Sequence, residues 1–435
     1  MSMEDAAPTS ARCWILTVGD ELVNGMRVDT NTAWLAGRLS DLGIRVDRAV
    51  SVGDEEAAIR EVLTAAGKDG VDVVVISGGL GPTQDDRTKP ALAAHFGADM
   101  ERIPEVEEAV RAFFRERDRT PSQVNLDQAL VPEGFEYRVN PVGTAPGLLL
   151  RREDLLVFAL PGVPPEMKAL YHDWAEGVLK ERFPGTVIRR RWYRTTGIGE
   201  SDLFNRIGGL EDMGPSVRLA YLPGPDGVSM YVTATVRDSE EAERLLDTAE
   251  ERIREGGADY LYGRGREGLP EHVGETLRER SQTLAVAESC TGGLLGSLIA
   301  DVPGASEWFL GGWITYSNEA KRKELGVPEE VLAEHGAVSE ETARAMAEGA
   351  RGRAGTDWAL SITGIAGPTG GTQEKPVGTV CIGCAGPSDT RVRTFRFGVG
   401  GRRVIRERSA AAALDMLRRR SEGLETDEGG WVSPR

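Results

Sequence analysis

A serine and two lysines form the first group of residues whose types and spacing could support catalysis. Ser289 lies in AESCTGG, where an apolar run gives way to glycines. A serine hydroxyl needs a base to act as a nucleophile, and no histidine lies in a neighbouring motif. Lysine can lose its proton when it is buried, whereas arginine cannot. Because the chain has only seven lysines, Lys321 (in TYSNEAK) and Lys375 (in EKPVG) are alternative bases, and Tyr316 could relay a proton.

Two cysteine motifs near this group have competing interpretations. Cys290 follows Ser289 and is a weaker candidate for the nucleophile, since a cysteine in the first turn of a helix often packs inward. Cys381 and Cys384 form a CxxC motif, but they lie in an apolar run, whereas a redox CxxC begins a helix. We therefore expect them to pack in a strand. The glycine-rich segment 363–371 suits a phosphate or an oxyanion.

A second group of residues, near the N-terminus, combines acidic side chains with glycine-rich loops. Residues 19–21 (GDE) follow an apolar run, residues 29–31 (DTN) begin the next predicted helix, and residues 77–83 (SGGLGPT) lead to Asp85 and Asp86. Loops at the carboxyl ends of parallel strands bind ligands in α/β folds, and their backbone N–H groups attract anions. Clustered acids then require a divalent cation that bridges phosphate oxygens. The pattern predicts a site for a phosphate-containing ligand and a metal.

Alternating apolar runs predict the elements that position this second group. We expect strands over 13–18, 44–52, 71–77 and 155–162, with helices between them. These include helices over 30–42 and 54–66, the latter capped by Asp54. This alternation predicts a doubly wound α/β domain over residues 1–180. Gly/Pro-rich loops at 140–147 and 160–167 are weaker signals of a site.

The chain beyond residue 180 predicts two more domains and a tail. Residues 181–265 indicate a small α+β domain, in which strands 218–222 and 228–236 flank a hairpin turn. That turn, Gly224–Gly227, also matches the GxxG of a KH loop, but a phosphate clamp should not carry Asp226. Residues 266–422 predict an α/β domain with helices over 269–280, from about 291 and over 402–420. Its strands are expected over 283–287, 309–316, 357–363, 377–384 and 391–397, and a disordered tail over 423–435.

Composition excludes several classes of function. The 435 residues carry a net charge of −17, the opposite of what duplex binding usually requires. No apolar run is long enough for a membrane span, and the N-terminus lacks a targeting pattern. Four cysteines are too few for a disulfide scaffold. The sequence therefore predicts a cytoplasmic protein with no nucleic-acid or membrane partner.

The motifs of the first domain resemble the CinA family, whose N-terminal domain is similar to molybdopterin-binding proteins. The resemblance rests on GDELVNGMRVDTN, GGLGPTQDDRT, NPVGTAPG and PGVPPEM. It implies a metal-dependent ADP-ribose pyrophosphatase that uses Mg, Mn or Co, with Asp54 and Asp86 as catalytic carboxylates. The implied metal ligands are Asp20, Asp85, Asp86 and Glu166, with Glu21 a further candidate for metal or ribose contacts. The implied substrate contacts are Asn31, Gly78, Gly79, Gly81, Thr83 and Thr144.

The motifs of the last domain resemble the CinA C-terminal domain, which is similar to nicotinamide mononucleotide deamidases that need no cofactor. AESCTGG, TYSNEAK, HGAVS, SITGIAGPTGG and EKPVGT carry this resemblance. It implies that Ser289 is the nucleophile and Lys321 its base, with Tyr316 and Thr363 supporting the site. The implied substrate contacts are Gly292, Gly293, Gly364, Gly367 and Lys375, with Arg402 or Arg406 on the phosphate.

The resemblance as a whole implies a bifunctional, homodimeric enzyme of pyridine-nucleotide salvage that acts on nicotinamide mononucleotide and ADP-ribose. Two other functions are compatible with these motifs. One is a molybdopterin-type binding protein, which would leave the Ser–Lys pair without a role. The other is an accessory protein of DNA uptake or repair, against which the acidic charge argues.

Overall fold

The computed structural model describes residues 11–152, 154–185, 187–398 and 400–424. Its internal contacts divide the chain into two compact units, one of residues 1–189 and 234–243, the other of residues 190–233 and 244–435. Of the predicted tail, residues 425–435 lie outside the described residues. Within the described residues, no helix combines the length and apolar character that a membrane crossing requires.

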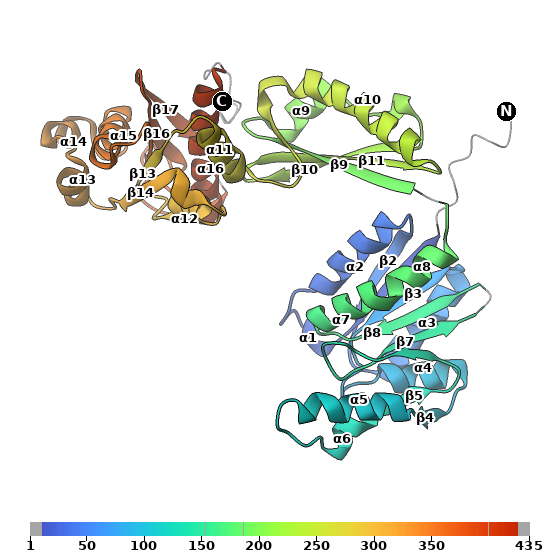
Figure 1. Cartoon of the computed structure of the whole chain (residues 1–435). Helices are drawn as coiled ribbons and strands as arrows, with labels where there is room; N and C mark the ends of the chain where they lie inside the picture. The colour runs from blue at the N-terminus through green and yellow to red at the C-terminus, as the bar shows by residue number, and fades with distance from the viewer. Residues whose placement is uncertain (1–10, 153, 186, 399, 425–435) are drawn as a thin grey trace. The chain divides into compact units, whose positions relative to one another are not determined.

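The first domain is built on a six-stranded sheet in the order β2-β1-β3-β8-β7-β6 (Figure 1). The four strands β2, β1, β3 and β8 are parallel, β7 pairs antiparallel with β8, and β6 pairs antiparallel with β7. The strands are β1 Arg12–Val18, β2 Arg45–Val52, β3 Val73–Ser77, β6 Glu136–Arg138, β7 Gly147–Arg151 and β8 Leu156–Leu160, with a separate pair, β4 Met100–Arg102 and β5 Leu130–Pro132.

Helices cover both faces of this sheet because β1, β3 and β8 are apolar on both sides. One core packs α2 and the α7–α8 segment against the sheet, and the other packs α3 and α4 against the opposite face. The helical segments are α1 Asp20–Val23, α2 Thr30–Asp41, α3 Glu56–Asp69, α4 Thr88–Phe96, α5 Pro104–Arg115, α6 Gln123–Leu126, η1 Asp127–Ala129, α7 Pro164–Leu170, the π-helix η2 Tyr171–Ala175 and α8 Glu176–Arg182. The predicted doubly wound α/β class is confirmed.

The middle domain follows the order strand, helix, two strands, helix, strand. Its elements are β9 Val187–Thr195, α9 Glu200–Ile207, η3 Glu211–Met213, β10 Val217–Gly224, β11 Gly227–Val236, α10 Ser239–Gly257, η4 Ala258–Tyr260 and β12 Leu261–Arg264. The two residues between β10 and β11 form a tight hairpin turn, so the hairpin interpretation of residues 224–227 is confirmed. A Cβ on Gly227 would lie 2.1 Å from the backbone oxygen of Thr195, which explains the glycine.

The last domain has a five-stranded sheet in the order β14-β13-β15-β16-β17. Strands β14, β13 and β15 are parallel, β16 pairs antiparallel with β15, and β17 pairs antiparallel with β16. The strands are β13 Leu284–Glu288, β14 Phe309–Ile314, β15 Trp358–Gly364, β16 Thr379–Ala385 and β17 Thr390–Arg396. Cys381 and Cys384 are buried within β16 and are not disulfide-bonded, which confirms that this CxxC packs in a strand.

Helices pack on both faces of this second sheet as well. Helices α11, α12 and α16 share a core with β13 and β15 on one face, while α13, α14 and α15 pack on the other. The helices are α11 Leu269–Glu279, α12 Leu294–Ala300, η5 Ala305–Glu307, α13 Asn318–Leu325, α14 Glu329–His335, α15 Glu340–Ala354 and α16 Gly401–Glu422.

Two predicted helix starts are wrong. Helix α3 begins at Glu56 with Glu55, and not Asp54, at its N-cap position; the Asp54 carboxylate instead accepts a hydrogen bond from the backbone N–H of Asp20 (2.9 Å). Helix α12 begins at Leu294 and not near Thr291, because the glycines at 292 and 293 have positive φ angles of 58° and 93°. Ser289 therefore lies in a turn before the helix.

Candidate active sites

Ser289 and Lys321 are brought together by adjacent parallel strands. Ser289 follows β13, and Lys321 lies in the first turns of α13, which follows β14. The Lys321 Nζ atom lies 2.9 Å from the Ser289 hydroxyl oxygen and 2.8 Å from the backbone oxygen of Thr315. This is the distance at which a neutral amine can accept the proton of a serine nucleophile.

Burial tunes Lys321 for that role. Its side chain is 1% exposed, and desolvation lowers its pKa from 10.5 to about 8, since burial disfavours the charged form. Among the described residues, this buried amine hydrogen-bonds to one carbonyl and one hydroxyl, and neither carries a charge that would stabilise the ammonium form. Near neutral pH a substantial fraction of Lys321 is therefore neutral and able to act as a base.

Glu288 fixes the turn that presents the nucleophile, and sequence reasoning missed it. This residue ends β13 and is 1% exposed. Its carboxylate accepts hydrogen bonds from the backbone N–H groups of Gly293 (3.0 Å), Leu295 (3.1 Å) and Gly296 (2.8 Å). The carboxylate thereby caps α12 from the preceding strand. A Glu at the end of an apolar run, six positions before the first residue of a helix, is the signal that could have found it.

This capping determines which groups could hold an oxyanion next to Ser289. The backbone N–H groups at the start of a helix would suit that role, but here they are already engaged. Three of them donate to the Glu288 carboxylate, while the N–H of Gly292 donates to the backbone oxygen of Ser289 and that of Leu294 to the backbone oxygen of Thr291. The start of α12 therefore does not provide the oxyanion donors.

The geometry separates the alternative bases and nucleophiles. Lys375 Nζ donates to the backbone oxygens of His335 (3.1 Å) and Val338 (2.8 Å), so it braces the HGAVS loop and does not contact Ser289. Burial raises the pKa of Cys290 to about 12, which keeps its thiol protonated at neutral pH. Among these residues, only Lys321 contacts the serine.

The residues implied in phosphate binding surround the same turn. The Arg402 guanidinium donates to the backbone oxygen of Gly367 (2.9 Å) and to the hydroxyl of Tyr316 (2.8 Å). Arg406 donates to the backbone oxygen of Thr291 (3.0 Å from Nε). Tyr316 is 60% exposed, so it is placed to meet a ligand and not to relay a proton from a buried position.

Thr363 and the glycines of the site shape its backbone. The buried Thr363 hydroxyl donates to the backbone oxygen of Ala337 (2.6 Å), which ties β15 to the HGAVS loop. A Cβ on Gly364 would meet Val380 at 2.7 Å, and one on Gly367 would meet Val377 at 2.6 Å. Gly292 and Gly293 lie in the positive-φ turn after Ser289. These residues hold the loops close together, whatever contacts they make with substrate.

In the first domain, Asp20 and Asp54 form a reciprocal pair. The backbone N–H of Asp20 donates to the Asp54 carboxylate (2.9 Å), and the backbone N–H of Asp54 donates to the Asp20 carboxylate (3.2 Å). Burial raises the pKa of Asp54, with further contributions from the negative charges of Asp20, Glu21 and Asp85. These four acids therefore share one electrostatic environment at the carboxyl ends of β1, β2 and β3.

The Asp86 carboxylate is engaged by the backbone and side chain of its own loop. One of its carboxylate oxygens accepts from the N–H of Gly81 (2.7 Å), and the other accepts from the N–H and hydroxyl of Thr83 (2.7 and 2.6 Å). Both oxygens thus hold the GGLGPT loop in shape. The neighbouring Asp85 is exposed and has no such bonds among the described residues.

Asn31 joins three of the strand-end loops. Its side-chain amide donates to the hydroxyl of Ser77 (3.0 Å) and the backbone oxygen of Gly162 (2.8 Å). Gly78 and Gly79 have φ angles of 113° and 65°, and a Cβ on either would lie within 2.3 Å of another atom. These contacts place the loops after β1, β3 and β8 at a common edge of the sheet, where α/β folds bind ligands.

Glu166 and Thr144 belong to a separate corner of that edge. The half-buried Glu166 carboxylate accepts from the side-chain amide of Asn140 (2.7 Å), and burial raises its pKa. A Cβ on Gly143 would lie 2.2 Å from a carboxylate oxygen of Glu166, so only a glycine permits the carboxylate to come this close. Thr144 is partly exposed in the same loop.

The acidic cluster fits only one kind of metal site. Across the part of the chain that the structure describes, no three His, Cys, Asp or Glu side chains are close enough to form a metal cage. Mg²⁺, however, is commonly held by one or two carboxylates together with substrate phosphate oxygens. Asp20 and Asp54, whose negative charges repel each other, could hold a cation in this way together with a phosphate ligand.

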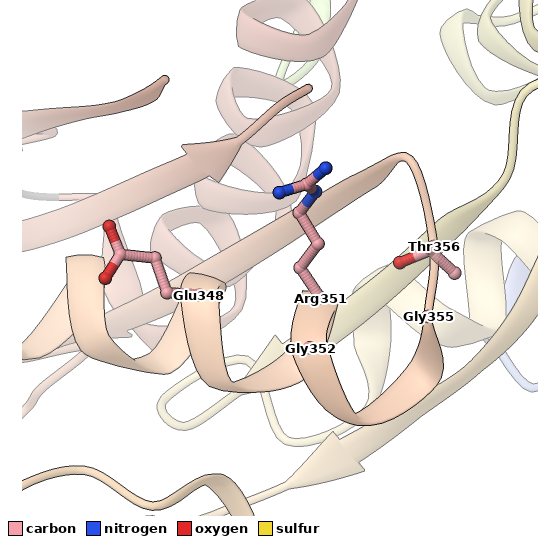
Figure 2. Close-up of a pocket in the computed structure, with 5 residues that line it drawn as sticks. All are labelled: Glu348, Arg351, Gly352, Gly355 and Thr356. Carbon is pink, nitrogen blue, oxygen red and sulfur yellow. The ribbon is translucent and has the colours of Figure 1, made fainter. Parts of the chain in front are cut away.

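A surface hollow in the last domain lies away from these residues. It is lined by Glu348, Arg351, Gly352, Gly355 and Thr356 at the end of α15, and its volume is about 390 Å³ (Figure 2). It precedes β15, whereas Ser289 follows the parallel strand β13, so the two lie at opposite ends of the sheet. Arg351 donates to the backbone oxygen of Asp357 (2.9 Å), which indicates a structural role.

Comparison with known families accounts for nearly the whole chain. Three family descriptions match: "Probable molybdopterin binding domain" over residues 14–181, "Damage-inducible protein CinA KH domain" over 190–263 and "CinA C-terminal domain" over 266–421. A CinA-like protein of Salinibacter ruber is 45% identical, with 93% of this chain and 98% of that protein covered. The chain belongs to the CinA family.

A second relative agrees with this assignment. A putative competence-damage inducible protein of Caldicellulosiruptor bescii is 42% identical, with 93% of this chain and 98% of the relative covered. Among solved structures, the competence/damage inducible protein CihA from Agrobacterium tumefaciens is 38% identical and matches 35% of this chain and 94% of its own, with a TM-score of 0.33. The family resemblance predicted from the motifs is confirmed, as is the three-part fold class.

Proposed function

We propose that the C-terminal domain of this CinA protein is an amidase that converts nicotinamide mononucleotide into nicotinate mononucleotide and ammonia. The observation that supports this most strongly is the buried Lys321 amine, 2.9 Å from the hydroxyl of Ser289. The substrate comes from the family resemblance. Arg402 and Arg406 support it, because two arginines beside the nucleophile suit a ligand that carries a phosphate.

The reaction is an acyl transfer in two halves. The Ser289 oxygen bonds to the carboxamide carbon while the neutral Lys321 amine takes the hydroxyl proton. Lys321 then gives that proton to the leaving nitrogen as the carbon–nitrogen bond breaks, and ammonia departs. In the second half, Lys321 takes a proton from water, the hydroxide attacks the acyl carbon, and Ser289 regains its proton as nicotinate mononucleotide leaves. No cofactor takes part.

Two lysines on the same helix provide a matched test of this mechanism. Lys321 is buried against Ser289, whereas the side chain of Lys323 is 70% exposed and pairs with Glu319. Ammonia release from nicotinamide mononucleotide should fall by at least about a hundredfold in Lys321→Ala and stay near wild type in Lys323→Ala. Equal rates in the two variants would contradict the proposal.

For the first domain we propose hydrolysis of the pyrophosphate of ADP-ribose into AMP and ribose 5-phosphate. The glycine loop at residues 78–81 and the acids around Asp54 support a phosphate ligand that is held together with a divalent cation. Asp20 and Asp54 would hold the cation with the substrate oxygens, and the cation would neutralise developing phosphate charge. The chain itself supplies the loop N–H groups and the ordering contacts of Asp86 and Asn31.

The test of this second activity compares an acidic residue of the proposed site with an acidic residue on the exposed surface of a helix. Asp54→Asn should abolish AMP formation, whereas Glu61→Gln, an exposed acid on α3, should not change it. Chelation should stop the reaction, and Mg, Mn or Co should restore it. If wild type binds ADP-ribose or a molybdopterin-type cofactor without cleavage, the alternative function, a binding protein, replaces this proposal. The homodimer that the resemblance implies is a further proposal, tested by light scattering.

A further inference from the structure

The middle domain has a chain order and sheet order found in proteins that bind nucleic acids on an open sheet. Its elements run βαββαβ, and its strands lie in the order β10-β11-β9-β12, with the first and third strands at the centre. Figure 1 shows α9 and α10 on one face of this sheet. RNA-recognition modules stack bases on aromatic side chains of a four-stranded sheet.

The direction of each side chain on the central strand β9 follows from its contacts. Arg191 bonds to Asp247 and Glu250 on α10 (2.7 Å each), and Tyr193 is buried beside Glu250. Because successive residues of a strand face opposite sides, Trp192 and Arg194 point away from the helices. Both are partly exposed.

An aromatic pair spans the two central strands on this open face. The rings of Trp192 on β9 and Tyr231 on β11 have centroids 4.9 Å apart. Tyr231 is partly exposed, and its neighbours Met230 and Val232 are buried toward the helices. The guanidinium of Arg266 lies over the Trp192 ring at 5.0 Å, and Arg194 donates to the Ser229 hydroxyl and to the backbone oxygen of Arg266 (2.7 Å).

Charge is segregated between the sheet and the helix that covers it. The four strands contain no Asp, Glu or Lys, and their six arginines are Arg189, Arg190, Arg191, Arg194, Arg218 and Arg264. Helix α10 contains three arginines and seven acids, the acids being Glu240, Glu241, Glu243, Asp247, Glu250, Glu251 and Glu255. Three of the strand arginines, Arg189, Arg191 and Arg264, pair with these acids on the helix side of the sheet. The other three, Arg190, Arg194 and Arg218, alternate with them and give the open face a local positive charge that the net charge of the whole chain hides.

We propose that this open face binds single-stranded nucleic acid. Bases stack on Trp192 and Tyr231, and the phosphate backbone follows the arginines, among them the exposed Arg218 on β10. Two partly exposed aromatic rings on adjacent strands match unstacked bases, whereas a duplex offers its bases only edge-on. The hairpin at residues 224–227 takes no part, since Asp226 at its tip repels phosphate. The proposal is independent of the two enzymatic activities. It means that the expectation of no nucleic-acid partner, which rests on the net charge, applies to duplexes and not to single strands.

Fluorescence anisotropy with labelled single-stranded oligo-U and oligo-dT, and with a duplex of equal length, tests the proposal on the full chain. Wild type should bind one or both single strands more tightly than the duplex. Trp192→Ala should weaken that binding by about tenfold or more, and Trp192→Phe should largely restore it. Ammonia release from nicotinamide mononucleotide should be unchanged in both variants. Absence of single-strand binding, equal binding of the duplex, or unchanged binding in Trp192→Ala would overturn the proposal.

Two arginines provide a charge-matched control that does not disturb the core. Arg218 lies on the open face, and Arg244 is exposed on α10, on the opposite side of the sheet. Arg218→Gln should weaken binding and lower its salt dependence, while Arg244→Gln should do neither. Equal effects of the two substitutions would show a non-specific polyanion effect and overturn the proposal, even if Trp192→Ala failed to fold.

Discussion

The pKa of Lys321 sets the pH range in which the proposed amidase works. Burial lowers that pKa from 10.5 to about 8, and a general base must be deprotonated to act. At about pH 7.5, an amine of pKa about 8 is neutral roughly a quarter of the time, whereas one of pKa about 10.5 is neutral about one part in a thousand. The shift therefore raises the amount of active base roughly 200-fold at this pH.

Arginine at this position removes the base while keeping the charge. Arg does not lose its proton in proteins, so Lys321→Arg should release ammonia about 10²–10⁴-fold more slowly at every pH. In wild type, kcat/KM for ammonia release should rise with pH and level off above about 8, because it reports the free enzyme. A rate that is flat across this range, a rise centred near 10.5, or an active Lys321→Arg variant would refute the reasoning.

Three further predictions test the structural support of the two sites. Glu288→Gln should lower the free energy of unfolding by roughly 3 kcal/mol and reduce ammonia release, since the amide cannot accept all three backbone N–H groups; calorimetry with an activity assay checks both. Lys89→Met should raise the thermal midpoint at pH 7 and have little effect near pH 10. Burial lowers the pKa of Lys89 from 10.5 to about 8. The buried charge therefore lowers the free energy of unfolding by its full amount below about pH 8, and this loss of stability disappears as the pH approaches 10.5. Gly79→Ala should destabilise the first domain by about 1–3 kcal/mol in denaturant unfolding, because its φ is 65° and a Cβ would lie 2.3 Å from Thr88.

Each of these three predictions has an outcome that would contradict it. An unchanged Glu288→Gln protein would mean that the three hydrogen bonds contribute little to the turn. A Lys89→Met variant that is less stable than wild type at pH 7 would show that the bond from Lys89 to the Gln128 oxygen outweighs the cost of burial. A Gly79→Ala variant of normal stability would show that the loop can relax away from Thr88.

The elements near the two sites were predictable because their signals are local. Apolar runs that end in glycines mark β1, β3, β13 and β15, and each structural strand lies within about two residues of its prediction. Helix starts were harder, since a side chain from outside a helix can cap it. Glu288 caps α12 from the preceding strand, and the sequence alone shows only an acid beside a strand.

The choice between Lys321 and Lys375 needed the tertiary structure. Both follow glycine-rich or polar loops near strands, and spacing does not show which side chain reaches Ser289. The parallel pairing of β13 and β14 brings α13 beside the serine, whereas Lys375 contacts the HGAVS loop. Asp86 shows the same limit, because hydrogen bonds within its own loop are not visible in a motif.

The measurement that tests the central claim most directly is ammonia release from nicotinamide mononucleotide by wild type and Ser289→Ala, assayed together. The account predicts steady release by wild type and a loss of at least about a thousandfold in the variant, because the acyl bond forms on that oxygen. The control Ser317→Ala, which removes the side-chain N-cap hydrogen bond of α13, should retain most of the activity. Turnover by Ser289→Ala at the wild-type rate, or no release by wild type, would contradict the account.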